Sequence, residues 1–417
     1  MIVIVSNVFA FAMQLAILST ANGNYRTEPF PVHLVSTKQD KGPIEQSPGY
    51  ADYAQGLLYG KQEHYDQAIA AFNKAEAKGF KTFELFLLRG QAYLELKRYE
   101  EAQTNILQAI AMQPQNPHGY SLMAMVHQGT EQWEKAVEAL SKGIAAVPKR
   151  AAGELYQARG IANIRLNKQE QAIKDLSQAL RLGRTAPVVY YKRGRAFAEL
   201  GRYKEAIDDF SEALNKQKNH HRSLLNRGWV YGCIGEFKKS SRDFDQLLSE
   251  NQEDALVHSL RGWVRLESDD VDGGLSDLIY ASEHGHSDPL TYLNLASAFY
   301  IKGALDKALE ENAKAFALQD SESEAAISFQ KGLLLLVSDK EREAKISYDH
   351  ARGVALKFAN RIELQEALAD LQDAMNVHKE IKDSAQEIVK ALEEAVSKTP
   401  KQEFSAKRCQ QLRTRQE

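Results

Sequence analysis

Apolar residues recur along most of the chain at steps of three and four positions, and polar turns separate the apolar runs. This spacing places apolar side chains on one face of a helix, so each run predicts a short helix with one buried stripe. Prolines are few and widely spaced between residues 49 and 352. Because proline ends or kinks a helix, their positions indicate joints between short helices.

A small residue recurs in each of nine consecutive units. The positions are Gly56, Gly90, Ala124, Gly160, Gly194, Gly228, Gly262, Ala296 and Gly332, spaced by 34, 34, 36, 34, 34, 34, 34 and 36 residues. Twelve residues after each comes a second position that is small in all units but the polar Ser240: Ala68, Ala102, Ala136, Ala172, Ala206, Ser240, Gly274, Ala308 and Ala344. A fixed period of this length indicates a repeat architecture. Each unit is therefore expected to be two helices crossing at close range, where only small residues fit.

Aromatic residues repeat as well. Tyr59, Tyr93, Phe197, Tyr231 and Phe299 follow the first small residue by three, and Phe72, Phe210, Phe244 and Tyr348 follow the second by four. With these positions the chain resembles the tetratricopeptide repeat family over roughly residues 49–352, most closely in the segment YYKRGRAFAELGRYKEAIDDFSEAL at residues 190–214. The resemblance implies an all-α, right-handed superhelical solenoid of about nine helix–turn–helix repeats. Stacked neighbours bury what one unit cannot, and the first helices line a concave surface.

The two ends of the chain have a different composition. Residues 1–21 are largely apolar and end in small residues, which resembles a secretory signal or membrane anchor, although the usual leading positive charge is missing. This predicts an exported, periplasmic or membrane-anchored protein, with a cytoplasmic one as the alternative. Residues 22–48 contain four prolines and scattered charge, which indicates a flexible linker.

Residues 353–397 follow the repeats and predict a C-terminal helix, continuous from Asn360 to Ser397 because no proline or glycine interrupts it. Since a solenoid needs a terminal cap, a capping helix is the first interpretation. An intermolecular coiled coil is the alternative, because the apolar spacing is close to seven. Residues 398–417 are basic and are expected to be a disordered solvated tail, with contact to acidic lipid or RNA as the alternative.

The chain has few residues that indicate catalysis. The formal net charge of −3 does not favour nucleic acid, and the two cysteines, Cys233 and Cys409, define neither a metal cluster nor a disulfide framework. No phosphate-binding loop or nucleophile elbow occurs. His284, His286 and Asp288 could contribute to a zinc site, but a third ligand is unspecified, so polar turn residues are the preferred interpretation. We expect no enzyme activity, no cofactor and no metal.

Arginine precedes the small residue in several units, and aspartate stands sixteen positions later in the same units. The pairs are Arg159 with Asp175, Arg193 with Asp209, Arg227 with Asp243, and Arg261 with Asp277. A unit without the arginine, such as the one with Met123, lacks the aspartate too. Because partly buried arginines need acidic partners, this matched occurrence predicts a structural ladder that joins helices rather than a ligand site.

The groove positions of the family suggest where a partner binds. Carried over to this chain, they are Tyr191, Arg195, Arg222, Trp229, Ser259, Trp263 and Tyr300. Aromatic and arginine side chains dominate protein interfaces, so a contact centred on Trp229 and Trp263 is one interpretation. Packing of each tryptophan against a neighbouring first helix is the other.

The function predicted from these observations is a non-enzymatic scaffold or adaptor that binds a peptide or helical segment of another protein in the concave groove. One alternative is a regulatory or substrate-recruiting subunit of an enzyme complex. A second alternative is an RNA-binding helical repeat protein, which the balanced charge disfavours. The lysine and asparagine pair that family members use to capture chaperone tails is absent from every unit, so we do not expect that partner.

Overall fold

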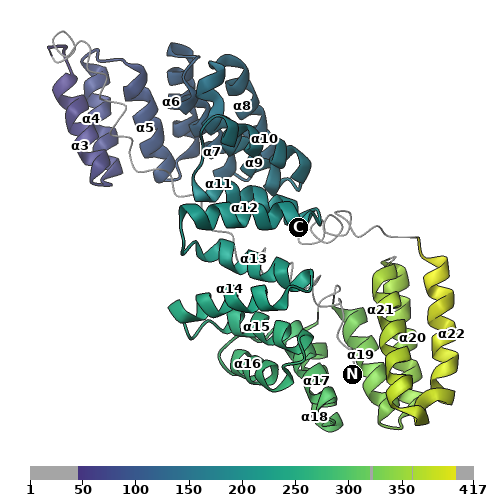
Figure 1. Cartoon of the computed structure of the whole chain (residues 1–417). Coiled ribbons are helices and arrows are strands. Elements are labelled where there is room, and N and C mark those ends of the chain that lie inside the picture. The colour runs from purple at the N-terminus through teal and green to yellow at the C-terminus, as the bar shows by residue number, and fades with distance from the viewer. Residues whose placement is uncertain (1–45, 320–322, 359, 401–417) are drawn as a thin grey trace. The chain divides into compact units, whose positions relative to one another are not determined.

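The computed structural model describes residues 46–319, 323–358 and 360–400 (Figure 1). In these ranges the chain forms twenty α-helices, two short 3-10 helices and no strand, which confirms the all-α prediction. The predicted signal or anchor, nearly all of the linker and the tail beyond residue 400 lie outside the described residues. Among the helices that are described, none combines the length and the apolar character needed to cross a membrane.

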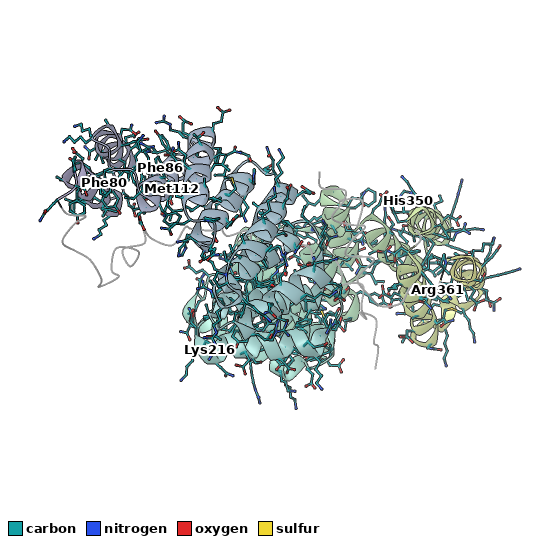
Figure 2. All side chains as sticks on the ribbon, turned by 90° about the horizontal axis from the view of Figure 1, so that it is seen from above. Phe80, Phe86, Met112, Lys216, His350 and Arg361 are labelled. Carbon is teal, nitrogen blue, oxygen red and sulfur yellow. The ribbon has the colours of Figure 1, made fainter. Side chains whose placement is uncertain are left out.

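The chain divides into two parts between Phe197 and Ala198. The N-terminal part holds four pairs of contacting helices and most of a ninth helix. They are α3 (Tyr50–Lys61) with α4 (Tyr65–Ala77), α5 (Phe83–Glu95) with α6 (Tyr99–Met112), α7 (Pro117–Gly129) with α8 (Trp133–Ala146), α9 (Gly153–Arg165) with α10 (Gln169–Arg181), and α11 (Pro187–Glu199), preceded at α9 by the 3-10 helix η2 (Lys149–Ala152). Phe80 and Phe86, marked in Figure 2, belong to the apolar core around α3, α4 and α5.

The C-terminal part begins within α11 and contains four more contacting pairs. Its helices are α12 (Tyr203–Lys216), α13 (His221–Cys233) with α14 (Phe237–Glu250), α15 (Ala255–Glu267) with α16 (Val271–Glu283), α17 (Pro289–Ile301) with α18 (Leu305–Leu318), α19 (Glu324–Val337) with α20 (Glu341–Lys357), and then α21 (Arg361–Val377) and α22 (Lys382–Lys398). The order of short paired helices is the one that the 34-residue period predicts. The right-handed sense of the superhelix stays a prediction.

The small residues of the first helices lie where the two helices of a repeat cross. A Cβ atom added to Gly56 would come within 2.6 Å of the Phe72 ring, and one added to Gly332 within 2.6 Å of Tyr348. The aromatic residue stands sixteen positions after the glycine in each case. These two crossings therefore join one missing side chain to one large ring, and this complementarity allows the tight packing of the pair.

The turn between the two helices of every repeat contains one residue with positive φ. These residues are Glu63, Lys97, Glu131, Asn167, Gly201, Gly235, Asp269, Gly303 and Asp339, with φ between 55° and 75°. Each follows the first small residue by seven positions, so the turns repeat with the same period as the helices. The left-handed conformation costs an ordinary L-residue about 1–2 kcal/mol, and the fold imposes it at six non-glycine positions.

We predict that Gly235→Ala lowers the free energy of unfolding by about 1 kcal/mol. No atom lies within 4 Å of the added Cβ, so the loss reflects the backbone conformation alone. Gly353→Ala is the matched control, because Gly353 lies inside α20 with ordinary φ and equally open surroundings. It is expected to raise stability by about 0.5–1 kcal/mol. Urea unfolding of both variants tests the pair, and a loss of stability in both would contradict the explanation.

The prediction of one continuous helix from Asn360 to Ser397 is wrong. Residues 353–357 complete α20, α21 ends at Val377, and the 3-10 helix η3 (Lys379–Ile381) leads into α22, which contacts α21 side by side. The hairpin buries both apolar stripes, whereas a straight helix would leave much of one stripe in water. Tertiary burial therefore overrides a local sequence that contains no helix breaker.

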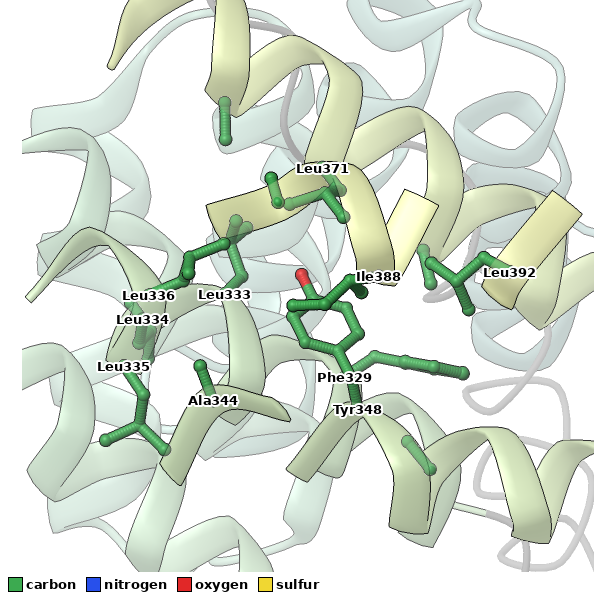
Figure 3. Packing of buried hydrophobic residues seen from close by; sticks show 14 of the residues in the cluster. Phe329, Leu333, Leu334, Leu335, Leu336, Ala344, Tyr348, Leu371, Ile388 and Leu392 are labelled. Atoms are coloured by element: carbon green, nitrogen blue, oxygen red, sulfur yellow. The ribbon is translucent and has the colours of Figure 1, made fainter. Parts of the chain in front are cut away.

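The hairpin of α21 and α22 covers the last repeat. Leu371, Ile388 and Leu392 join one buried cluster with Phe329 and Tyr348 of α19 and α20 (Figure 3). The Arg361 guanidinium, marked in Figure 2, donates to the carbonyls of Val396 and Thr399 and so links the open ends of the two helices. The packing is that of a terminal cap, the first of the two interpretations given for this segment.

Candidate partner-binding face

The first helices of the C-terminal part lie closer to one another than the second helices do. Within the described residues, α13 contacts α15 and α15 contacts α17 somewhat more extensively than α14 contacts α16 or α16 contacts α18. We call the surface of α13, α15, α17 and α19 on this side the inner face.

Most of the predicted groove residues are buried. Tyr191 and Arg195 lie in the core of the N-terminal part, while Trp229, Ser259, Trp263 and Tyr300 are buried in the C-terminal part. The Ser259 hydroxyl lies 2.8 Å from that of Thr291, which joins α15 to α17. Arg222, in the first turn of α13, is exposed. The role of these side chains in binding stays a prediction, and Arg222 is the one that a partner reaches without any rearrangement.

Both tryptophans are 3% exposed and pack between repeats. The Trp229 ring meets the Tyr203 ring edge to face, with centroids 6.4 Å apart. Trp263 lies over Gly232 of the preceding first helix, where an added Cβ would come within 2.7 Å of the indole ring. These contacts favour packing against neighbouring helices, the second interpretation of the tryptophans.

The arginine row forms ion pairs at the predicted spacing. Arg159 donates from Nε and Nη2 to the two carboxylate oxygens of Asp175, at 2.9 and 2.7 Å, and Arg227 binds Asp243 in the same bidentate way. In the second repeat, Arg89 donates to the Asn105 side chain. Asn105 stands sixteen positions after the arginine, where the repeats of Arg159 and Arg227 carry aspartate. Arg193 and Asp209 belong to different parts of the chain, and their pairing stays a prediction. Fork-to-fork pairs of this kind fix the angle between two helices.

Each of these arginines also reaches the preceding repeat, which the sequence analysis did not predict. The acceptors of the Nη1 donors are side chains on the preceding second helix: Asn73 for Arg89, Ser141 for Arg159, Ser177 for Arg193, Ser211 for Arg227 and Asp245 for Arg261. The distance in sequence is 16 residues, except for Arg159, where the 36-residue interval makes it 18. One guanidinium therefore connects two helices of its own repeat with the repeat before it.

The seventh repeat concentrates three hydrogen-bond donors on one carboxylate. Asp277 accepts from Arg261, from Arg265 at 2.8 Å and from His258 at 2.8 Å. Burial opposes ionisation, but the bonds from Arg261 and His258 outweigh it and lower the pKa of Asp277. Arg265 stands where other repeats carry an aromatic residue, so the side chain that weakens the family resemblance here has a structural partner.

The histidines near residue 286 are occupied by local contacts. His286 pairs with Asp288 at 2.8 Å, and Asp288 also caps α17 through the backbone amides of Leu290 and Thr291. His284 stacks on Tyr280. In the described ranges no three histidine, cysteine or acidic side chains are grouped so as to hold a metal ion.

Two acidic side chains on the inner face have strongly raised pKa values. Burial raises the pKa of Glu267, at the end of α15, to about 7, and that of Asp370, in α21, to about 8. Repulsion from Asp373 and Glu267 adds to the rise at Asp370. Helix α21 lies against α19, and its hairpin shares a buried cluster with Tyr300 of α17. Acidic residues from two helices, α15 and α21, thus form an acidic cluster next to Tyr300 of α17.

Neither carboxyl group was predicted from the sequence. Glu267 lies four residues after Trp263 on the same helix, so the groove positions of the seventh repeat carried a usable signal. Asp370 lies outside the repeats, in a segment that was expected to continue straight. Nothing in its spacing indicated that the hairpin returns it to the first helices.

Comparison with known proteins agrees with the helical repeats. Models of the tetratricopeptide repeat family match residues 53–117 and residues 187–220. A search of curated protein sequences found no match.

Several solved structures are similar to parts of the chain. MamA from Desulfovibrio magneticus RS-1 is 22% identical, covering 40% of this chain and 94% of that one, with a TM-score of 0.38. A tetratricopeptide repeat protein from Parabacteroides merdae ATCC 43184 is 16% identical, covering 61% and 98%, with a TM-score of 0.44. YrrB, described as a TPR protein with an unusual peptide-binding site, is 24% identical, covering 44% and 94%, with a TM-score of 0.38.

Proposed function

Because the chain is a tetratricopeptide repeat protein, we propose that it is a non-enzymatic scaffold that holds a segment of another protein on its inner face. Proteins with this fold generally bind other proteins or peptides. The partner segment lies along the first helices α13 and α15, where Arg222 is exposed. It is extended or helical, because a row of parallel first helices offers a long narrow surface rather than a closed pocket.

The position of α21 carries this proposal. This helix lies against the first helix α19, and the ring of His378, which follows it, lies 6.1 Å from the Tyr300 ring of α17. The inner face of the last repeats therefore already accommodates a helix, supplied by the chain itself. The same face over α13 and α15 is built from equivalent positions, which supports a helical or extended partner there.

The arginine ladder supports the proposal by exclusion. Arg159, Arg227 and Arg261 have their donors occupied by Asp175, Asp243 and Asp277 and by the preceding repeats. These guanidinium groups stabilise the stack, so they are not the groups that recognise a partner. An RNA partner is disfavoured by the formal net charge of −3, because RNA binding requires a positively charged surface. A regulatory subunit of an enzyme complex would use the same face, and the identity of the captured protein distinguishes it from a scaffold.

We predict that Arg222→Glu reduces capture of the partner at least about tenfold, whereas Arg242→Glu leaves it unchanged. Both arginines are exposed and both substitutions change the charge equally, but Arg222 lies on the first helix α13 and Arg242 on the second helix α14. Capture from the source cell is compared by quantitative mass spectrometry for the wild type and both variants. Equal capture by all three, or a loss confined to Arg242→Glu, would contradict the proposed face.

A further inference from the structure

The side chain of His258, in the first turn of α15, joins two segments that are separate in the sequence. Its Nδ1 atom lies 2.8 Å from Oδ1 of Asp277 in α16, and its Nε2 atom lies 3.0 Å from the backbone carbonyl oxygen of Gln252. Gln252 belongs to the turn between α14 and α15, so the ring connects this turn to the second helix of the seventh repeat. The His258 side chain is largely enclosed, at 14% exposed.

Both partners of the His258 ring are hydrogen-bond acceptors. A backbone carbonyl oxygen accepts a hydrogen bond and donates none. Burial opposes the ionisation of Asp277, but the bonds from Arg261 and His258 outweigh it and lower the pKa of this carboxyl, so it is a carboxylate at neutral pH. A neutral imidazole has one N–H and satisfies one of the two acceptors, whereas an imidazolium satisfies both. The geometry therefore fits the doubly protonated ring.

The charges beside the ring also fit a protonated His258. Arg261 and Arg265 donate to the same carboxylate, and each has a second acidic neighbour, at 2.7 and 3.6 Å respectively. The group consists of His258, Arg261 and Arg265 on α15, Asp245 on α14, Asp277 on α16 and Asp270 at the N-cap of α16. With His258 protonated, the three cations of this group face three carboxylates, and the group has no excess charge.

Two other histidines lie near this contact. His284 stacks on Tyr280, whose ring lies 4.2 Å from that of His258. The Nδ1 atom of His284 lies 2.8 Å from the carbonyl oxygen of Tyr280, a contact that a neutral ring satisfies. On α13, Nε2 of His221 lies 3.9 Å from Oδ2 of Asp254, the N-cap residue of α15. These neighbours supply the controls for a titration of His258.

We propose that His258 is a pH-sensitive fastener, which holds the turn before α15 against α16 while it is protonated and releases that turn when it loses a proton. The proton leaves for water from Nε2, because an N–H that faces a carboxylate makes a stronger bond than one that faces a neutral carbonyl. The lone pair left on Nε2 then faces the oxygen of Gln252, and that contact is lost. Release of the turn loosens the first turn of α15 whether or not a partner is bound to the inner face.

The test follows two quantities in the full chain from pH 5 to pH 9. The ¹⁵N NMR signals of the histidine rings, assigned with His258→Gln, report which ring nitrogen of His258 carries a proton. Millisecond amide hydrogen exchange, corrected for its intrinsic pH dependence, reports the protection of residues 251–258. As His258 titrates, this protection is expected to fall about three- to tenfold, the effect of one hydrogen bond. The neutral ring is expected to keep its proton on Nδ1.

Constant protection through the titration of His258, or a neutral ring with its proton on Nε2, would overturn the proposal. His258→Gln donates to one acceptor and does not titrate, so its turn is expected to show low protection that is independent of pH. His284→Gln is the matched control and should keep the pH dependence of the wild type. Because His221 remains in both variants, a pH dependence that persists unchanged in His258→Gln would assign the effect to His221 and contradict the fastener.

Discussion

Replacing Asp277 by alanine is expected to lower the free energy of unfolding of the C-terminal part by about 3–5 kcal/mol. The substitution removes the acceptor that Arg261, Arg265 and His258 share and leaves their donors partly buried, with only the exposed Asp245 and Asp270 as acidic neighbours of the two arginines. It also loosens the repeat that carries Trp263, so tryptophan fluorescence reports the local loss. Urea unfolding followed by fluorescence and by circular dichroism measures it.

Asp245→Ala is the matched control. Asp245 binds the same Arg261 at 2.7 Å, but its side chain is 55% exposed on the preceding repeat. Exposed pairs contribute about 0–1 kcal/mol, so this variant is expected to remain close to the wild type. Equal effects of the two substitutions would show that the buried bidentate pair is no more important than a surface contact, and the structural interpretation of the ladder would fail.

Stability is expected to fall as the pH rises from 5 to 9, by about 2–4 kcal/mol. The folded pKa values of Glu267 and Asp370, about 7 and about 8, lie above the ordinary values of 4.5 and 3.8. Between these limits the folded state holds protons that the unfolded state has lost. The contribution of the two acids is thus fully present below about pH 4 and is lost as the pH passes 7 and then 8. Unfolding in urea at each pH measures the slope.

The comparison with Asp370→Asn isolates this effect. His127 and His220 have pKa values lowered by burial, so their contribution to stability rises with pH and opposes the trend of the acids. Because both histidines remain in the variant, the difference between the two profiles reflects Asp370. Asp370→Asn should be the more stable protein at pH 9 and should approach the wild type at pH 5. Parallel profiles would contradict the raised pKa of this carboxyl.

The repeats could be predicted from the sequence because one physical requirement recurs every 34 residues. Gly56 and Gly332 must be small, since a large ring at the sixteenth position after each occupies the space of their side chains. The same regularity predicted the pairing of Arg227 with Asp243, because both residue types change together between units. The second contact of each arginine was not predictable in this way. Its acceptor changes among asparagine, serine and aspartate, as at Asn73, Ser211 and Asp245, so no single residue type marks it.

The end of the chain was harder to predict, since no repeat constrains it. The break after Val377 occurs in a segment without proline or glycine, and burial of Leu371 and Ile388 on the last repeat determines it. The acidic cluster of Glu267 and Asp370 depends on that break, because only the hairpin brings Asp370 near Glu267. A contact centred on Trp229 and Trp263 was one of two interpretations of the sequence, and the structure favours the other, packing between repeats.

Photo-crosslinking along the two rows of helices tests most directly whether the inner face binds the partner. The photoreactive residue p-benzoyl-phenylalanine replaces Arg222 or Leu256 on the first helices α13 and α15, and Arg242 or Ser276 on the second helices α14 and α16. We predict that Arg222→p-benzoyl-phenylalanine and Leu256→p-benzoyl-phenylalanine cross-link one discrete protein that the substitutions at Arg242 and Ser276 do not. Cross-links to that protein from Arg242 and Ser276, with none from Arg222 and Leu256, would contradict the account.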